Sequence, residues 1–477
     1  MKKQLNVLYV AAEIAPFGAT GGLADVGESL PEVLGEKGVN ISRVMPKYKG
    51  LEDRYKLEKV CSFIVETSGK ANVANIYKYK EDVVTTYFIG NDDYFERDNY
   101  YGYNDDDIRF GFFSKAVLEM LIVLSIKPGI IHLNDWQSAL ISLFLKKEYS
   151  HIDFYKEIKV MYTIHNLQYQ GLFNKETLDK LCLSTKYFNM ESLEYYGKIS
   201  YMKAGIIFSD IITTVSETYA KEIQTPLYGY GLDGILKKNK NKICGITNGI
   251  HYDKFNPQTD SYIKFNYHID NAIHGKNENK KYLQKHIGLP IKNAPLFGMV
   301  SRLSEQKGID LCLKAISQLI KEDIQFVILG TGDSHYEEQL LQLSKKYPDK
   351  LKVMIEFNQE MARLIYASSD FFLMPSLFEP CGLSQIYSMR FGTVPIVRKT
   401  GGLVDTVKPF DIGSKTGTGL IFQHYNGDAL KESIKKGIGL YKNTDIWKSI
   451  VRNCMSQRFS WDESAKMYID KYNELIN

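Results

Sequence analysis

Short apolar runs that alternate with helical patterns constrain the fold of this chain more than any other feature. The first run, QLNVLYVAA, leads into a glycine-containing loop and then a helical pattern over about 23–38. Similar runs follow at 129–133, 159–164 and 210–215, and the alternation restarts in the second half with LFGMV, FVILG, DFFLM and TVPIV. Such runs are typical of strands buried on both faces of a parallel sheet. The sequence therefore predicts an α/β protein with two Rossmann-like domains.

The chain length also favours two domains, because 477 residues are too many for one ordinary hydrophobic core. We expect an N-terminal domain over 1–250, a C-terminal domain over 251–457, and a terminal amphipathic helix over 458–477. A polar stretch over about 92–107 is typical of a long loop. A polar, lysine-rich region, 266–285, follows the domain boundary.

Composition argues against several classes of protein. The net charge of +4, from 60 basic and 56 acidic residues, is too small to indicate nucleic acid or an anionic membrane as a partner. The six cysteines are scattered without a CxxC pair, so the sequence predicts no disulfide framework and fits a cytoplasmic location. No segment approaches the ~18 uninterrupted apolar residues that a membrane span needs.

The stretch 375–407 carries the densest set of candidate site residues. Glu379 opens the string E-P-C-G, and an apolar strand then runs into K-T-G-G-L at 399–403 and a helical pattern. A strand that ends in glycines and opens a helix presents backbone N–H groups at the positive end of the helix dipole, which suits a phosphate. The lone acid beside such a loop indicates a sugar next to a phosphate.

A second string, S-R-L-S-E-Q-K-G at 301–308, follows a predicted buried strand. The guanidinium of Arg302 and the ammonium of Lys307 can converge on one diphosphate. A solvated start of a helix is the alternative, and the residues alone leave both interpretations open.

Strand ends in the first half carry further candidates. Asp135 lies in H-L-N-D-W and His165 in T-I-H-N-L-Q-Y-Q-G, each just after a predicted strand, at the edge where α/β proteins bind ligands. The alternatives are an acid that caps the next helix and a structural histidine.

Gly330 and Gly332 form a strand, G-x-G and helix pattern that also occurs in dinucleotide-binding proteins. The third glycine of that fingerprint is missing, and no acid ends a second strand at the required distance. The sequence therefore predicts no NAD cofactor. The sequence has no cluster of histidine and cysteine ligands, so it indicates no metal site.

Together these strings resemble the motifs of bacterial glycogen synthases and plant starch synthases, and the resemblance spans nearly the whole chain. The matching motifs are E-P-C-G, T-G-G-L, S-R-x-x-x-Q-K-G, H-x-x-D-W, N-G-[IV] and T-I-H-N-L-x-Y-Q-G. The resemblance implies the GT-B architecture, with two facing Rossmann-like domains and a C-terminal helix that crosses back to the N-terminal domain. It also implies a retaining transfer of glucose from ADP-glucose to the non-reducing end of an α-1,4-glucan such as glycogen, without a cofactor or metal.

The resemblance implies a catalytic role for four residues. His165 is expected near the reacting carbon of the transferred glucose, and Glu379 beside the donor glucose. Arg302 and Lys307 are expected to neutralise the departing phosphate. The expected substrate-binding residues are Gly21, Gly22, Asp25, Asp135, Asn248, Phe357, Cys381, Gly382, Gly401, Gly402 and Leu403. For Asn248 the alternative is an ordinary Asn-Gly turn, and for Phe357 it is a core phenylalanine. No obvious second acid accompanies Glu379, which argues against a hydrolase with two flanking carboxylates.

Position 19 departs from the family pattern K-T-G-G-L-A-D-V, because Ala19 stands where the pattern has lysine. The resemblance implies that this lysine binds the nucleotide sugar, and a lost charge-assisted contact costs about 1.5–3 kcal/mol. Two alternatives therefore stay open: a glucan-binding or regulatory homologue with weakened catalysis, and a GT-B glycosyltransferase with another acceptor. The intact catalytic candidates favour the enzyme, and the long T-I-H-N-L-x-Y-Q-G and E-P-C-G strings favour a glucan acceptor.

Overall fold

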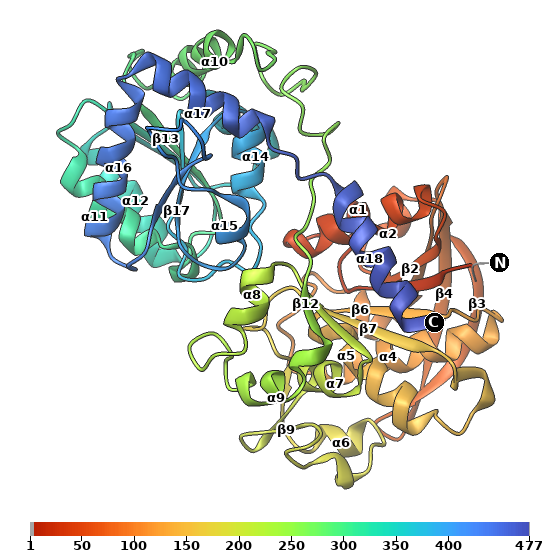
Figure 1. Cartoon of the computed structure of the whole chain (residues 1–477). Coiled ribbons are helices and arrows are strands. Elements are labelled where there is room, and N and C mark those ends of the chain that lie inside the picture. Colours follow the sequence, from red (N-terminus) through yellow and green to blue (C-terminus); the bar gives the residue numbers. More distant parts are fainter. Residues whose placement is uncertain (1–3, 477) are drawn as a thin grey trace. The chain divides into compact units, whose positions relative to one another are not determined.

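The computed structural model describes residues 4–476 of the chain (Figure 1). The chain forms two compact units, each built around its own β-sheet with helices packed on it. Unit 1 comprises the residues up to Asn248 and those from Trp461 onward, and unit 2 comprises Gly249–Ser460. The predicted fold class, α/β with two Rossmann-like domains, is confirmed.

Within the described residues, unit 1 has a nine-stranded sheet in the order β12-β11-β7-β6-β1-β2-β5-β4-β3. The pairs from β12 to β5 are parallel, and the β3-β4 hairpin adds an antiparallel edge. The chain moves from β1 to β2 on one side and later to β6 on the other, so the switch point of the sheet lies between β1 and β6. The strands are β1 (Asn6–Val10), β2 (Asn40–Pro46), β3 (Glu58–Thr67), β4 (Lys70–Lys80), β5 (Thr85–Gly90), β6 (Ile130–Asn134), β7 (Lys159–Ile164), β11 (Ile211–Thr214) and β12 (Ile243–Gly245).

Helices and one small sheet complete unit 1. The helices are α1 (Gly22–Glu36), α2 (Leu51–Arg54), α3 (Asp92–Phe95), α4 (Asp106–Val123), α5 (Asp135–Leu143), α6 (Thr177–Lys180), α7 (Tyr201–Phe208), α8 (Glu217–Glu222), α9 (Asp233–Lys238) and α18 (Trp461–Ile476). The small sheet joins β8 (Leu172–Phe173), β10 (Lys198–Ser200) and β9 (Glu194–Tyr195). The prediction of one long loop over 92–107 is wrong in part, because α3 begins this stretch, α4 begins at its end, and Arg97 pairs with Asp105 at 2.7 Å between them.

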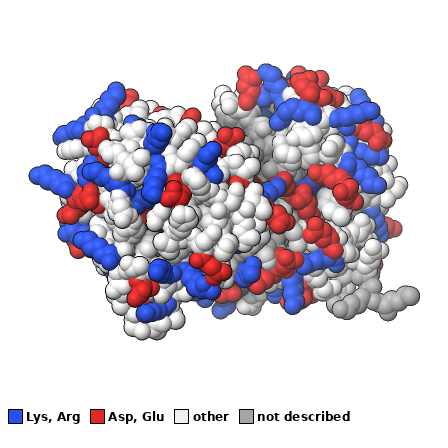
Figure 2. All heavy atoms as spheres, turned by 90° about the horizontal axis from the view of Figure 1, so that it is seen from above, with Lys and Arg blue, Asp and Glu red and all other residues white. Residues whose placement is uncertain are grey.

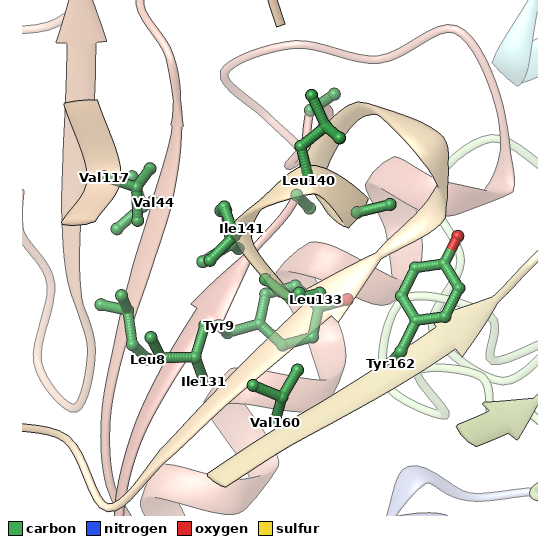
Figure 3. Close-up of a cluster of buried hydrophobic side chains, with 14 of the residues drawn as sticks. Leu8, Tyr9, Val44, Val117, Ile131, Leu133, Leu140, Ile141, Val160 and Tyr162 are labelled. Carbon is green, nitrogen blue, oxygen red and sulfur yellow. The ribbon is translucent and has the colours of Figure 1, made fainter. Parts of the chain in front are cut away.

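The core of unit 1 follows from the apolar runs of its sequence. Figure 3 shows Leu8, Ile131 and Val160, from three adjacent strands, in one cluster with Leu140 and Ile141 of α5. All five side chains are buried. Because side chains alternate between the two faces of a strand, the residues between these strand positions point to the opposite face of the sheet.

The last helix, α18, belongs to unit 1 although it lies at the far end of the chain. Its buried residues Trp461, Ala465, Tyr468 and Tyr472 recur at helical spacing and therefore form one face. The hydroxyl of Ser464 donates a hydrogen bond to the carbonyl of Thr247 at 2.6 Å. The predicted C-terminal helix thus packs on the N-terminal part of the chain.

Within the described residues, unit 2 has a six-stranded parallel sheet in the order β15-β14-β13-β16-β17-β18. Its switch point lies between β13 and β16, for the same topological reason as in unit 1. The strands are β13 (Leu296–Val300), β14 (Gln325–Leu329), β15 (Leu351–Met354), β16 (Phe371–Met374), β17 (Val394–Arg398) and β18 (Leu420–Phe422). The helices are α10 (Ala272–His286), α11 (Ile309–Leu319), α12 (Ser334–Lys346), α13 (Gln359–Ser368), α14 (Ser384–Arg390), α15 (Gly401–Thr406), α16 (Gly427–Tyr441) and α17 (Thr444–Ser456).

Two buried lysines anchor α10, the helix that forms most of the lysine-rich region. The ammonium of Lys276 donates to the hydroxyl of Thr393 at 2.5 Å and to the carbonyls of Ala367 and Phe391 at 3.1 and 3.2 Å. Burial lowers the pKa of Lys276 to about 7. Lys280 forms a buried ion pair with Asp370 at 2.6 Å.

Basic and acidic side chains are interspersed on the face that Figure 2 shows, as the small net charge leads one to expect. Among residues 4–476, no helix is both long and apolar enough to span a membrane.

Candidate active site

The Glu379 carboxylate lies at the centre of a polar cluster in unit 2. Lys307 places its ammonium 2.9 and 2.7 Å from the two carboxylate oxygens, and the hydroxyl of Ser376 donates to one of them at 3.0 Å. Glu379 is only 5% exposed. Lys307 follows β13 and Glu379 follows β16, so the cluster lies at the switch point of the sheet, where open α/β sheets bind ligands.

Two local features hold this cluster together. Gly308 has a φ of 72°, and a Cβ there would lie 2.3 Å from the carbonyl oxygen of Pro375, so only glycine lets the two loops approach this closely. The buried Arg398 donates from Nε to the carbonyl of Ser376 at 2.7 Å and from Nη2 to the carbonyl of Leu377. The loop that carries Glu379 is therefore fixed by the strand that precedes the glycine turn.

The glycine turn packs directly against the E-P-C-G loop. The N–H of Gly402 donates to the carbonyl of Glu379 at 3.0 Å, and the N–H of Leu403 donates to the carbonyl of Thr400 at 3.1 Å. Cys381 is buried, and Gln385 donates to the carbonyls of Cys381 and Gly382 at 3.1 and 2.8 Å. The N–H groups of Gly402 and Leu403, which we expected to be available to a phosphate, thus already bond within the protein. Phosphate contact by Gly401, Gly402 and Leu403 stays a prediction.

Two further candidates of unit 2 are exposed. The guanidinium of Arg302 forms none of the ion pairs found among residues 4–476, which leaves its donors available to an anion. Phe357 is 85% exposed, so the alternative of a core phenylalanine is wrong. An exposed ring can stack on a nucleotide base.

In unit 1, Asp135 is held by the loop that follows the neighbouring strand, β7. It begins α5 with a left-handed φ of 52°, and its Oδ1 accepts hydrogen bonds from the backbone N–H groups of His165 at 2.8 Å and Asn166 at 3.4 Å. The alternative of a helix cap is therefore wrong, because the carboxylate caps the loop after β7 instead. Burial raises the pKa of Asp135 to about 7, although the two backbone hydrogen bonds act in the opposite direction.

The hydrogen bonds around His165 define its tautomer. Asn134 donates through Nδ2 to the carbonyl of Val10 at 3.0 Å, so its Oδ1 is the acceptor for His165 Nε2 at 2.9 Å and for the hydroxyl of Tyr9 at 3.1 Å. His165 Nε2 then carries the proton, and Nδ1 presents a lone pair. Burial lowers the pKa of His165 to about 3, so the ring is neutral at physiological pH.

One glycine allows the H-L-N-D-W and T-I-H-N-L-Q-Y-Q-G segments to pack against each other in the fold. Gly171 has a φ of 60°, and a Cβ there would lie 2.5 Å from the ring of Trp136. The loop that follows His165 can therefore pack onto the helix that Asp135 begins. This contact brings the two strings together at the carboxyl edge of the sheet.

The loop after β1 lies at the same edge, beside the switch point of unit 1. Glu13 is buried and accepts hydrogen bonds from the hydroxyls of Thr20 and Tyr101, both at 2.8 Å. Ala19 is exposed, as are Gly21, Gly22 and Asp25. A Cβ on Gly21 would have no neighbour within 4 Å among the described atoms, so packing within the protein does not require glycine at this position.

Asn248 is the last residue of the N-terminal part of unit 1. It lies after β12 in a segment that forms no turn, so the alternative of an ordinary Asn-Gly turn is wrong. Its Oδ1 is buried and has no hydrogen-bond partner among residues 4–476. A buried acceptor without a partner is unusual and is a candidate for ligand contact.

The structure thus gathers the candidates into two clusters: Asp135 and His165 in unit 1, and Lys307 and Glu379 with the E-P-C-G loop in unit 2. Arg302 and Phe357 lie on the surface of unit 2. Sequence reasoning missed the residues that hold these side chains: Tyr9, Asn134, Ser376 and Arg398. Asn134 and Arg398 lie within or next to the quoted strings, but no spacing rule marks them.

Comparisons with known proteins agree with this arrangement. Residues 6–238 match the starch synthase catalytic domain family, and residues 272–451 match the glycosyl transferases group 1 family. Glycogen synthases from Desulforamulus reducens and Alkaliphilus metalliredigens are 44% and 45% identical over 99% of this chain, which covers 99% and 100% of their lengths.

Solved structures give the same result. The catalytic domain of starch synthase IV from Arabidopsis thaliana, bound to ADP and acarbose, aligns with a TM-score of 0.91 and 32% identity over 99% of this chain and 100% of that chain. Sucrose-phosphate synthase from Thermosynechococcus elongatus aligns with a TM-score of 0.63 at 17% identity over 99% of both chains, and this likeness concerns the fold alone.

Proposed function

Since the chain belongs to the family of bacterial glycogen synthases and plant starch synthases, which have the GT-B fold, we propose that it transfers glucose from ADP-glucose to the non-reducing end of an α-1,4-glucan with retention of configuration. The single observation that carries this proposal is the buried Glu379 carboxylate, held by Lys307 and Ser376 at the switch point of unit 2. A carboxylate fixed in this way can stabilise positive charge on a sugar ring without accepting a proton.

Arg302 and Lys307 act on the departing phosphate in this proposal. When the bond between the anomeric carbon and the phosphate oxygen breaks, negative charge develops on that oxygen. The Lys307 ammonium is already fixed by Glu379, and the unpaired Arg302 guanidinium can bind a phosphate with two parallel hydrogen bonds. Positive charge that is positioned beforehand stabilises the transition state without reorganisation.

Retention follows if the acceptor attacks the same face that the phosphate leaves. The hydroxyl oxygen of the glucan forms the new bond to the anomeric carbon while the bond to the phosphate breaks. The hydroxyl proton passes to the departing phosphate oxygen, so the step needs no protein base. This fits a site in which the one central acid, Glu379, is occupied by hydrogen bonds from Lys307 and Ser376.

Asp135 and His165 bind sugar hydroxyl groups in this proposal. The neutral imidazole offers a lone pair at Nδ1, and Asp135 uses Oδ1 for the backbone and leaves Oδ2 for a hydroxyl group. Neutral donors and acceptors suit a sugar better than a full charge does, because its hydroxyl groups are neutral.

ADP-glucose and an α-1,4-glucan such as glycogen are the partners in this proposal. The reaction uses no cofactor and no metal, since Arg302 and Lys307 supply the positive charge. We place the protein in the cytoplasm, which fits six cysteines that all lie within the described residues without a disulfide.

Glucose incorporation into glycogen by the purified protein tests the proposal. ADP-glucose and UDP-glucose are compared as donors, each with and without EDTA. We expect incorporation from ADP-glucose that EDTA does not change, and slower incorporation from UDP-glucose. No incorporation from either donor would contradict the proposal. If glycogen still bound to the inactive protein, this result would support the second candidate function, a glucan-binding homologue. Ala19, which stands where the family pattern has lysine, also favours that candidate.

A further inference from the structure

A buried chain of hydrogen bonds links the last helix of unit 1 to the strands that end at Asp135 and His165. The hydroxyl of Tyr472, on α18, lies 2.7 Å from Nδ1 of His132 on β6. Nε2 of His132 lies 2.6 Å from the hydroxyl of Thr163 on β7, and that hydroxyl lies 2.5 Å from the hydroxyl of Thr213 on β11. We call these four residues, Tyr472, His132, Thr163 and Thr213, the polar row.

The polar row lies directly beneath the candidate site of unit 1. His132 precedes Asn134 by two residues on β6, and Thr163 precedes His165 by two residues at the end of β7. Residues two apart on a strand point to the same face, so the polar row and the Asn134–His165 hydrogen bond form two successive layers.

Tyrosine rings of α18 cover the lower layer. The rings of Tyr468 and Tyr472 lie 5.5 and 5.9 Å from the ring of His132, measured between centroids. Tyr9 connects the two layers, because its ring packs edge-on against His132 at 5.0 Å while its hydroxyl donates to Asn134. A shift of α18 would therefore displace the strand ends that carry Asp135 and His165.

The hydrogen bonds of the polar row fix the orientation of the His132 ring. His132 is fully buried and has hydrogen-bond partners at both ring nitrogens. Burial lowers the pKa of His132 to about 3, so the ring stays neutral at physiological pH. A histidine with its single donor and single acceptor both in use is fixed in tautomer and orientation.

We propose that Tyr472 is a positioning residue for the sugar-binding side chains Asp135 and His165, through His132 and Thr163. Tyr472 touches neither of these side chains in the contacts of the described structure and lies more than 300 positions from them in sequence. The inference rests on the proposed function for its kinetic readout. Catalytic constellations need placement to within about 0.5 Å, so a small relaxation at the strand ends is enough to slow the reaction.

The test removes one hydroxyl group. Tyr472→Phe leaves Nδ1 of His132 without a partner, and Tyr155→Phe is the matched control. Tyr155 is also a buried tyrosine of unit 1, and its hydroxyl donates to the carbonyl of Leu118 at 2.7 Å, away from the polar row. We expect both variants to melt at a lower temperature. Only Tyr472→Phe should lower kcat for glucose transfer, by about tenfold, while KM for ADP-glucose stays within twofold in both variants.

A second variant separates the effect on catalysis from a loss of folded protein. A second readout tests the inference without relying on the proposed function. Thr163→Val interrupts the polar row on the other side of His132, and the double variant should be no slower than the slower single variant, because the residues act as one unit. Ring nitrogen resonances of 15N-labelled histidine report His165 directly. They should shift in Tyr472→Phe and stay unchanged in Tyr155→Phe.

The outcomes separate the two proposals. A wild-type protein that transfers no glucose would refute the proposed function, and the His165 resonances alone would then decide the role of Tyr472. Either a kcat of Tyr472→Phe within twofold of the control, in an active wild type, or unshifted His165 resonances would overturn the inference.

Discussion

The contacts of Glu379 define its expected role at the scale of a single residue. Glu379→Gln keeps the shape of the side chain but removes the charge opposite Lys307. We expect kcat to fall by about 100-fold, since removal of one preorganised electrostatic group from a site costs about 100- to 1000-fold. Affinity for ADP should change little. Initial rates on glycogen and calorimetry with ADP measure the two effects.

Glu305→Gln is the control for this change, because Glu305 is an exposed acid in the same loop as Lys307. A Glu379→Gln enzyme that kept a third or more of the wild-type kcat would remove Glu379 from the mechanism.

Ala19 is the residue at which the sequence and the expected chemistry disagree. Its side chain is exposed, so a lysine can be accommodated there. If the missing charge weakens donor binding, Ala19→Lys should raise kcat/KM for ADP-glucose by roughly 10- to 100-fold, which corresponds to a charge-assisted contact of about 1.5–3 kcal/mol.

Ala19→Gln adds length without charge and should leave kcat/KM near the wild-type value. An equal gain from both variants would show that packing, and not charge, limits donor binding. If neither the wild type nor Ala19→Lys transferred glucose, the result would favour the alternative of a glucan-binding homologue.

The raised pKa of Asp135 predicts how stability depends on pH. In the unfolded chain the carboxyl titrates near pH 4, and in the folded protein its pKa is about 7. The folded state therefore binds the proton more tightly, and the stability gained from this proton is complete below pH 4 and is lost as pH rises to about 7. Relative to Asp135→Asn, the wild type should lose stability over this range.

Urea denaturation at several pH values between 4 and 8 measures this difference. Asp53→Asn, at an exposed position of α2, is the control and should not change the pH dependence. A stability difference between wild type and Asp135→Asn that is constant with pH would contradict a raised pKa of Asp135.

At the scale of elements, the placement of α10 depends on Lys276. Lys276→Met removes the donors to the Ala367 carbonyl and the Thr393 hydroxyl, while the Phe391 carbonyl keeps only the hydroxyl of Tyr267. We expect the free energy of unfolding of unit 2 to fall by about 2–4 kcal/mol, since each unsatisfied buried group costs about 1–3 kcal/mol. Urea denaturation followed by tryptophan fluorescence, to which Trp447 of unit 2 contributes, measures the loss.

Lys281→Met is the matched control, because Lys281 lies on the exposed face of the same helix and pairs with Glu278. It should change stability by no more than about 0.5 kcal/mol. Equal losses in the two variants would show that burial of the Lys276 ammonium is not what anchors α10.

The same helix, α10, shows which features of a single element cannot be predicted from its sequence. Its sequence is polar and lysine-rich, and nothing in the spacing marks Lys276 as buried, because the carbonyls that bind it come from distant segments around 367 and 391. The expected loop over 92–107 failed for a related reason. Its acids begin α4 and pair with Arg97, and composition alone does not separate such a turn from a loop.

At the scale of the whole molecule, the apolar runs predicted both sheets, because strands buried on both faces have few alternatives. The strings around Glu379 and His165 predicted which strand ends matter, because parallel strands bring their carboxyl ends to one edge of a sheet. The supporting contacts could not be predicted. The link between Tyr472 and His132 joins residues 340 positions apart, and no local pattern encodes it.

The central claim is a retaining transfer of glucose from ADP-glucose to an α-glucan, and proton NMR of one reaction mixture tests it most directly. The purified protein is incubated with ADP-glucose and a short maltooligosaccharide, and the anomeric signals are followed from the first turnover. We predict growth of α-1,4 signals at the rate at which the ADP-glucose signal declines. A β-linked product, free glucose alone, or an unchanged donor would each contradict the claim.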